Sequence, residues 1–256
     1  MSTLAGKVAL ISGTGSGMGR AAALVFAAKG SQVVGCDIDA AASEETMRMV
    51  RDAGGDMISV APLDLATSEG AEAWVDKAVE AHGGFDILYN NASALRTGPF
   101  DSMLEDDWYF TIRNELHLVY HSTRAAWPHL VRRGGGVIIN VASISAIRGA
   151  SFVPQSAHGA SKGGVLALTR HLCGAGAEHG IRVNAISPGL IRTPATAPFV
   201  DDPEGPVPGL LRQVPSGRVG EPEEVAQLAA FLASDAAAYI NGANVVIDGG
   251  VSAMAG

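Results

Sequence analysis

The sequence predicts an α/β fold in which about seven parallel strands form one doubly wound sheet with helices on both faces. Two observations lead to this prediction. Short apolar runs alternate with helical segments along the whole chain, which is typical of a parallel sheet whose two faces are both covered. A glycine-rich turn at residues 12–19 joins the first apolar run to the first helix, as in a Rossmann-type fold that binds a dinucleotide.

With 256 residues, of which 47% are hydrophobic and 17% charged, the chain can bury one large core, so residues 1–256 are expected to form a single domain. The net charge of −8 argues against nucleic acid and anionic membranes as partners. Two cysteines, Cys36 and Cys173, suggest no disulfide framework. No apolar run approaches the roughly 18 residues of a membrane span, so we expect a cytoplasmic protein with small-molecule partners.

The first strand is expected at residues 8–11 and the first helix at 20–28, with the glycine turn between them. Glycine lets the backbone turn tightly and approach a diphosphate, while free N–H groups at the helix start can hold the anion. A glycine-rich turn alone is also typical of an ordinary loop. The prediction of a dinucleotide site therefore depends on the rest of the chain.

The second strand, residues 32–36, ends before Asp37, about twenty residues after the glycine turn. A carboxylate at this place can accept two hydrogen bonds from an adenosine ribose and repels a 2′-phosphate. Neither Ser16 nor Ile38 offers a basic group for such a phosphate. The pattern favours NAD over NADP. The alternative is that Asp37 caps a helix that begins near Ala40.

Further strands and helices are expected in alternation. The strands are 57–62, 85–89, 137–142, 181–186 and 243–248, and the helices are 40–53, 68–82, 101–133, 155–177 and 222–233. Asp64, Asn90 and Ser143 follow strands. Because open α/β sheets bind ligands at the carboxyl edge of the strands, we expect a ligand cleft there.

Ser143 could hydrogen-bond a substrate carbonyl or alcohol at the end of its strand, or it could be a plain turn serine. His158 and Lys162 are four residues apart and share one face of the helix 155–177, although two solvated side chains would give the same spacing. His117 and His121 are also four apart, but no third ligand is suitably spaced, so no metal site is expected.

The proline-rich stretch at about 194–216 has no strong period and is interpreted as a mobile substrate cover. Its apolar side chains, Phe199, Val207, Leu210 and Leu211, suggest an apolar or cyclic substrate.

Several motifs together resemble the short-chain dehydrogenase/reductase family over essentially the whole chain. They are the glycine turn with Ser12 in place of the usual Thr, Asn90-Asn91-Ala92 followed by Ser93 in place of the usual Gly, Asn114, Ser143, Ala160-Ser161-Lys162, Ser187-Pro188-Gly189 and Asp248-Gly249-Gly250. The resemblance implies an NAD-dependent oxidoreductase, assembled as a homotetramer in which the helices 101–133 and 156–177 pair between subunits.

The resemblance also implies roles for individual residues. Those that would contact the cofactor are Gly13, Ser16, Gly17, Met18 and Gly19 at the diphosphate and adjoining ribose, Asp37 at the adenosine ribose, Asp64 and Leu65 at the adenine, Asn90 at the sugar region, Ile191 and Thr193 at the nicotinamide carboxamide, and Lys162 at the nicotinamide ribose. Ile38 and Ala92 would also contact the cofactor. Asn114 would anchor a water relay behind Lys162, and Ser143 would orient the substrate oxygen.

The sequence departs from the family at the catalytic tyrosine, whose position holds His158. Three interpretations remain open. His158 could transfer the proton in the oxidation of a secondary alcohol or reduction of a ketone; the site could be inactivated, by engineering or naturally, and only bind NAD; or His158 could be the base of a non-redox dehydratase or lyase. Because Lys162 and an oxidised nicotinamide should keep the imidazole neutral, we expect a preference for alcohol oxidation.

Overall fold

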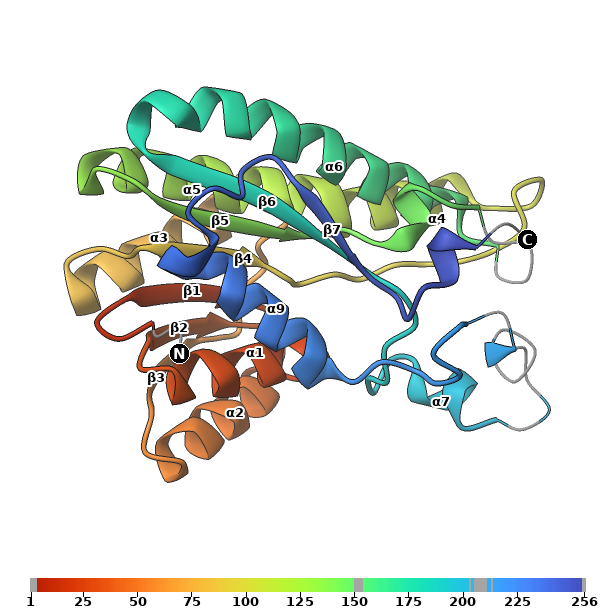
Figure 1. Cartoon of the computed structure of the whole chain (residues 1–256), viewed down its shortest axis with the longest axis horizontal. Coiled ribbons are helices and arrows are strands. Elements are labelled where there is room, and N and C mark those ends of the chain that lie inside the picture. Colours follow the sequence, from red (N-terminus) through yellow and green to blue (C-terminus); the bar gives the residue numbers. More distant parts are fainter. Residues whose placement is uncertain (1–3, 150–153, 203, 205–210, 213, 255–256) are drawn as a thin grey trace.

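The computed structural model describes residues 4–149, 154–202, 204, 211–212 and 214–254. Within these residues one seven-stranded parallel sheet has the order β3-β2-β1-β4-β5-β6-β7, which confirms the predicted fold class (Figure 1). The strands are β1 Val8–Ser12, β2 Gln32–Cys36, β3 Asp56–Val60, β4 Ile87–Asn90, β5 Gly136–Val141, β6 Ile181–Pro188 and β7 Asn244–Ile247.

The strand order reverses at β1, which pairs with β2 on one side and with β4 on the other. Leu10 of β1 is in register with Val34 of β2 and with Leu88 of β4. The chain leaves β1 toward β2 and β3 and later returns to β4, so the connections diverge on the two sides of this point. A crevice at the carboxyl ends of β1 and β4 is the expected ligand site of such a sheet.

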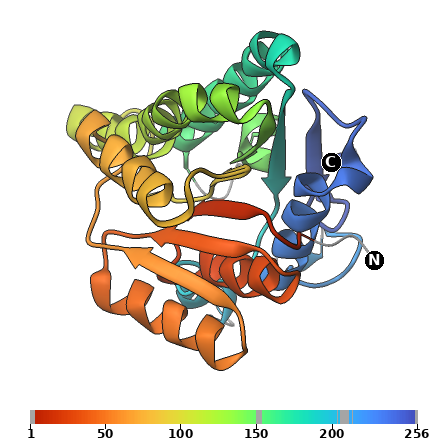
Figure 2. The same ribbon diagram turned by 90° about the vertical axis from the view of Figure 1, so that its left-hand side faces the viewer.

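Two layers of helices cover the sheet (Figure 2). On one face, α1 Gly17–Ala28, α2 Ala40–Asp52 and α9 Pro222–Ala233 enclose a core that includes Phe26 and Val225. On the other face, α3 Ser68–His82, α5 Leu118–Arg133 and α6 Ser156–Gly176 enclose Trp74 and Leu130. The central strands β1 and β4 are buried on both faces and mostly apolar, whereas the edge strands β3 and β7 are only partly buried.

The long helix expected at 101–133 is interrupted, so that prediction is wrong in detail. Residues 101–104 precede the first turn, α4 spans Glu105–Ile112, a π-helical turn η1 spans Arg113–His117, and α5 follows. Three acidic residues in the first turn of α4 favour a helix start there through the helix dipole. The π turn adds a residue to the helical ladder and contains both Asn114 and Glu115, and such turns often occur at functional sites.

The predicted cover segment lies partly outside the described residues, which include neither Val207 nor Leu210. Its described part contains the short helix α7 Ala197–Val200 and exposed Phe199, and its role as a cover stays a prediction. Among the described helices, none combines the length and the hydropathy that crossing a membrane requires.

Candidate active site

The glycine positions in the turn after β1 have little room for a side chain. Gly13 has a φ of +74°, and a Cβ there would lie 2.9 Å from Cα of Ala92. A Cβ on Gly19 would lie 1.8 Å from the carbonyl oxygen of Gly13. Helix α1 begins at Gly17, and the side chain of its N-cap, Ser16, makes no capping hydrogen bond. The N–H groups of this helix start are therefore not capped by Ser16, which fits the binding of a diphosphate.

Asp37 lies at the carboxyl end of β2 and contacts the glycine turn. Its Oδ2 accepts a hydrogen bond from the N–H of Gly15 at 2.8 Å, and its Oδ1 accepts one from Asp39 at 2.9 Å. Helix α2 is capped by Asp39, whose Oδ1 accepts from the N–H of Ala42 at 3.0 Å. The alternative role of Asp37 as the cap of this helix is therefore wrong. Ile38 beside it is exposed.

Arg20 is a basic residue at this turn that the sequence argument overlooked. Its Nη2 donates to the carbonyl of Gly15 at 2.6 Å, and its Nε donates to Thr46 Oγ1 at 2.9 Å. The signal was available, because Arg20 is four residues after Ser16 and so lies one helical turn beyond it. A cation thus lies close to the turn whose other neighbour is the Asp37 carboxylate.

The residues expected at the adenine lie at the start of the segment after β3. Asp64 forms an ion pair with Arg113 of η1, with 2.6 Å between Oδ2 and Nη2, and accepts a second hydrogen bond from the N–H of Ala66 at 2.9 Å. Leu65 is buried beside it. The ion pair joins this segment to the π-helical turn.

The side chain of Asn90 is buried in the core of the sheet. Its Nδ2 donates to Asn140 Oδ1 at 2.8 Å and to Thr123 Oγ1 at 3.1 Å, and its contact with the cofactor sugar stays a prediction. Ser12 holds the neighbouring segment, because its Oγ accepts hydrogen bonds from the N–H groups of Asn91 at 2.9 Å and Ala92 at 3.0 Å. Ser12 stands in place of the usual threonine, and its hydroxyl links β1 to the end of β4.

The segment after β6 lies beside the glycine turn. Ile191 is buried and forms an isolated parallel bridge with Gly220. Thr193 Cγ2 lies 3.1 Å from the position that a Cβ on Gly17 would take. Thr193, one of the two residues expected at the nicotinamide carboxamide, therefore lies against the start of α1.

Three predicted catalytic residues come from β5 and α6. Ser143 follows β5, and its Oγ accepts from the N–H of Ser145 at 3.1 Å. Lys162 is buried, and its Nζ donates to the carbonyl of Val141 at 2.9 Å. Burial lowers the pKa of Lys162, and Glu115 partly offsets this shift. His158 lies one turn earlier on α6, with 12% of its side chain exposed. Asn114 lies in η1, where its Nδ2 donates to the carbonyl of Phe110 at 2.8 Å.

The carboxylate of Glu115 in η1 contacts this group, and sequence reasoning missed it. Glu115 is 0% exposed. Its Oε1 lies 2.8 Å from Nδ1 of His158 and accepts from Ser93 Oγ at 2.6 Å. Its Oε2 lies 3.0 Å from the same Nδ1 and accepts a hydrogen bond from Ser161. Nζ of Lys162 lies 3.9 Å from Oε1.

Burial raises the pKa of Glu115, but the charge of Lys162 and the hydrogen bonds from His158 and Ser161 lower it by more. The net pKa lies below the ordinary value, so the carboxyl is ionised at neutral pH. An ionised carboxylate only accepts hydrogen bonds. Nδ1 of His158 must therefore carry a proton, and Nε2 has no hydrogen-bond partner within the described part of the chain.

A signal for Glu115 was present in the sequence. Residues 115, 118, 119, 122 and 126 recur at the spacing of one helical face, and the last four of these positions are buried in α5. An acidic residue on a buried face needs partners. The spacing could not identify those partners, because they come from α6 and from the segment after β4.

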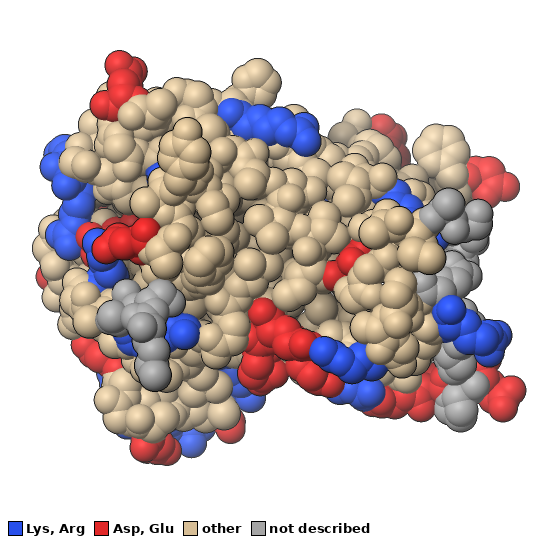
Figure 3. Space-filling model, in the orientation of Figure 1, with Lys and Arg blue, Asp and Glu red and all other residues tan. Residues whose placement is uncertain are grey.

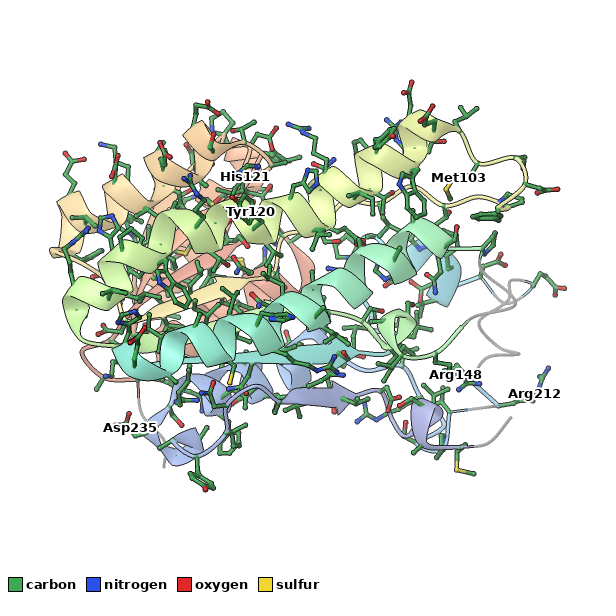
Figure 4. The ribbon with its side chains drawn as sticks, turned by 90° about the horizontal axis from the view of Figure 1, so that it is seen from above. Met103, Tyr120, His121, Arg148, Arg212 and Asp235 are labelled. Carbon is green, nitrogen blue, oxygen red and sulfur yellow. The ribbon has the colours of Figure 1, made fainter. Side chains whose placement is uncertain are left out.

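A cavity of about 270 Å³ lies beside the start of α6. Its lining includes Phe100, Ser145, Arg148, Gln155 and Gly159. Arg148 donates a hydrogen bond to the carbonyl of Val251, and Figure 4 labels it at this end of the molecule. Among the described residues, no group of three His, Cys, Asp or Glu side chains could hold a metal ion.

Comparison with known proteins identifies the family. A family model described as enoyl-(acyl carrier protein) reductase matches residues 13–252. The chain is 38% identical over 250 residues to 3-oxoacyl-[acyl-carrier-protein] reductase FabG of Thermotoga maritima, covering 97% of this chain and 98% of that protein.

Two solved structures have the same fold. A short-chain type dehydrogenase/reductase from Mycobacterium marinum superposes with a TM-score of 0.93 at 31% identity, covering 98% of both chains. A 7α-hydroxysteroid dehydrogenase complexed with NADH and 7-oxo glycochenodeoxycholic acid has a TM-score of 0.91 at 31% identity, covering 97% of this chain and 95% of that one. The chain therefore belongs to the short-chain dehydrogenase/reductase family of oxidoreductases.

Proposed function

We propose that the protein interconverts a secondary alcohol and a ketone with NAD, and that His158 transfers the proton. The observation that carries the proposal is the group at the end of β5. Ser143 follows β5, the buried ammonium of Lys162 donates to the β5 carbonyl of Val141, and His158 lies one turn before Lys162 on α6. The glycine turn after β1 supports the binding of a dinucleotide. The two named relatives whose substrates are given, the 3-oxoacyl reductase and the hydroxysteroid dehydrogenase, also act on ketones or alcohols.

In this proposal each side chain has one task. Ser143 donates a hydrogen bond to the substrate oxygen, and Lys162 holds the nicotinamide ribose. Nε2 of His158 accepts the O–H proton while the carbon–oxygen double bond forms. The bound nicotinamide supplies the acceptor for the hydride that leaves the same carbon. In ketone reduction the imidazolium returns the proton to the oxygen.

The physical reason for expecting a preference for alcohol oxidation no longer holds once Glu115 is taken into account. That expectation considered only the positive charges of Lys162 and the oxidised cofactor. The Glu115 carboxylate, 2.8 Å from Nδ1 of His158, stabilises the imidazolium that ketone reduction requires. The site is therefore suited to both directions, and the relative stability of alcohol and ketone decides between them.

The choice of NAD rests on Asp37, whose carboxylate would meet a 2′-phosphate with like charge. Arg20 acts in the opposite sense, but its guanidinium already donates to Gly15 and Thr46. The expected apolar or cyclic substrate stays a prediction from the sequence, because the cavity lining is mixed and includes Ser145, Arg148 and Gln155 as well as Phe100.

We also propose a homotetramer. Figure 4 shows α5 and α6 side by side on the outside of the molecule, with Tyr120 on α5, and Tyr120 is 48% exposed. Figure 3 shows few charged side chains across the middle of the face over α6 and β7. Such a surface suits contacts between subunits. A cytoplasmic location stays a prediction from the sequence.

The test combines binding and turnover. We expect calorimetric titration to show NAD binding more tightly than NADP, and absorbance of the reduced nicotinamide to rise with a cyclic secondary alcohol. NAD binding without turnover in either direction across alcohols and ketones would contradict the proposal and favour an inactivated site. Conversion of a substrate without any change in reduced nicotinamide would favour a dehydratase or lyase.

A further inference from the structure

We propose that Glu115 is a positioning residue that holds His158 in the Nδ1–H tautomer, so that a buried carboxylate–imidazole pair carries the proton transfer in this protein. The inference rests on the proposed function, in which His158 moves the proton. It concerns a residue that neither the sequence motifs nor the proposed roles include. Three observations support it: the anchoring of the carboxylate, the tautomer that it imposes, and the charges around it.

The carboxylate is anchored from several elements of the fold. Ser93, after β4, donates to Oε1 at 2.6 Å, and Ser161, on α6, donates to Oε2. Each oxygen also lies within hydrogen-bond distance of Nδ1 of His158. A carboxylate held in this way has little freedom to rotate. The imidazole that it contacts is therefore fixed in position as well as in charge state.

The tautomer decides which nitrogen can do chemistry. Because Glu115 only accepts hydrogen bonds, the proton of a neutral His158 lies on Nδ1 and the lone pair lies on Nε2. Nε2 has no hydrogen-bond partner among the described residues. Gln155, Ser156 and Gly159, which are close to His158 at the start of α6, line the cavity. The nitrogen left free is therefore the proton acceptor. The same logic applies when a buried carboxylate orients the histidine of a hydrolase triad.

The charges of the cluster balance in the resting state. Lys162 and Glu115 carry opposite charges 3.9 Å apart, and the two other side chains that hydrogen-bond the carboxylate, Ser93 and Ser161, are neutral. When Nε2 takes a proton, the new positive charge forms beside the carboxylate rather than beside Lys162 alone. Glu115 thus favours the protonated state that follows alcohol oxidation and precedes ketone reduction.

Two of the departures from the family pattern meet at this carboxylate. Ser93 replaces the usual glycine and His158 replaces the usual tyrosine, and both hydrogen-bond the same Oε1 of Glu115. A lone substitution of the tyrosine would not explain the serine. We therefore interpret Ser93, Glu115 and His158 as one hydrogen-bonded group.

The experiment is nitrogen NMR of the whole protein labelled with ¹⁵N-histidine, with and without NAD. A His158→Asn variant identifies the signals of His158 among the 7 histidines. We expect the Nδ1–H tautomer in the wild type. In Glu115→Gln the amide can donate as well as accept, so the Nε2–H form should appear. The affinity for NAD should be unchanged, while kcat falls on the order of 10²-fold.

Two further readouts separate positioning from a merely structural role. In Glu115→Gln, kcat for alcohol oxidation should fall far more than KM changes, because the carboxylate contacts the imidazole and not the substrate. Ser93→Ala removes one anchor of the carboxylate and should lower kcat by a smaller factor. As a matched control, Glu80→Gln exchanges an exposed glutamate on α3 and should change neither the tautomer nor the rate.

An Nε2–H tautomer in the wild type would overturn the proposal, as would a Glu115→Gln protein with the wild-type tautomer and rate. If Glu115→Gln does not fold, the wild-type tautomer and the rate of Ser93→Ala decide the matter. If the tautomer depends on Glu115 but no alcohol or ketone is converted, the positioning role stands and the proposed function fails.

Discussion

The two halves of the crevice are built in different ways. The half expected to hold the adenosine diphosphate comes mainly from one stretch of chain, β1 through the segment after β3, and its turn depends on backbone that lacks a Cβ. The catalytic half joins η1, the segment after β4 and α6. Glu115 contacts Ser93, 22 residues away in sequence, and His158, 43 residues away. Local sequence therefore specifies the first half, whereas tertiary contacts specify the second.

If the halves are separable, changes in the catalytic half should affect rate without affecting cofactor binding. Replacing His158 by Ala removes the proposed proton acceptor, so kcat should fall roughly 10²- to 10⁴-fold while the affinity for NAD is unchanged. Single-turnover absorbance and calorimetry measure the two effects. A His158→Ala protein that keeps the wild-type kcat would contradict the separation of the two halves. So would one whose NAD affinity falls in proportion to kcat.

The stability of the catalytic half should depend on pH. The pKa of Glu115 is lower in the folded protein than its ordinary value of 4.5, so its ionised form stabilises the fold above that value. This contribution is lost as the pH falls through the lowered pKa.

Urea unfolding of the wild type and Glu115→Gln at several pH values measures this effect. At about pH 7 the variant should be less stable by roughly 3 kcal/mol, because Lys162 is left without its carboxylate. The difference should shrink toward about pH 3. A difference that grows on acidification would contradict the ionised state of Glu115.

The affinity for NAD should be most sensitive to side chains added in the glycine turn after β1. Gly19→Ala places a Cβ 1.8 Å from the carbonyl oxygen of Gly13, so the turn must move, and NAD affinity should fall by about 100-fold. Gly174→Ala is the matched control, since nothing lies within 4 Å of its added Cβ. It should leave binding intact and raise helix stability by about 0.5–1 kcal/mol. Equal losses of NAD affinity in both variants would contradict a specific requirement for glycine in the turn.

The smallest effect is expected at Asp37. Asp37→Ala removes the charge that would repel a 2′-phosphate, so the preference for NAD over NADP should fall by about tenfold. Calorimetric titration with both dinucleotides measures it. If Asp37→Ala leaves the preference unchanged and Arg20→Ala alters it, the choice of cofactor lies with Arg20.

The fold was predictable because its signals are local. Apolar runs and helical segments alternate, and α3 and α9 have the predicted bounds. The break in the helix at 113–117 was not predictable, since the π turn is coupled to contacts that Arg113 makes with Asp64 and Glu115 makes with α6. The spacing placed His158 and Lys162 on one helical face, and the resemblance to the family implied their roles. Glu115 was missed because its role becomes visible only when three distant segments are placed together.

The measurement that most directly tests the central claim is kcat of His158→Tyr beside the wild type, with the same alcohol and NAD. The variant restores the tyrosine usual in the family but leaves Glu115 without the Nδ1–H donor that it now contacts. If His158 works with Glu115 as the proton-transfer group, kcat should fall. A large activation would contradict the account and identify the natural site as an inactivated one.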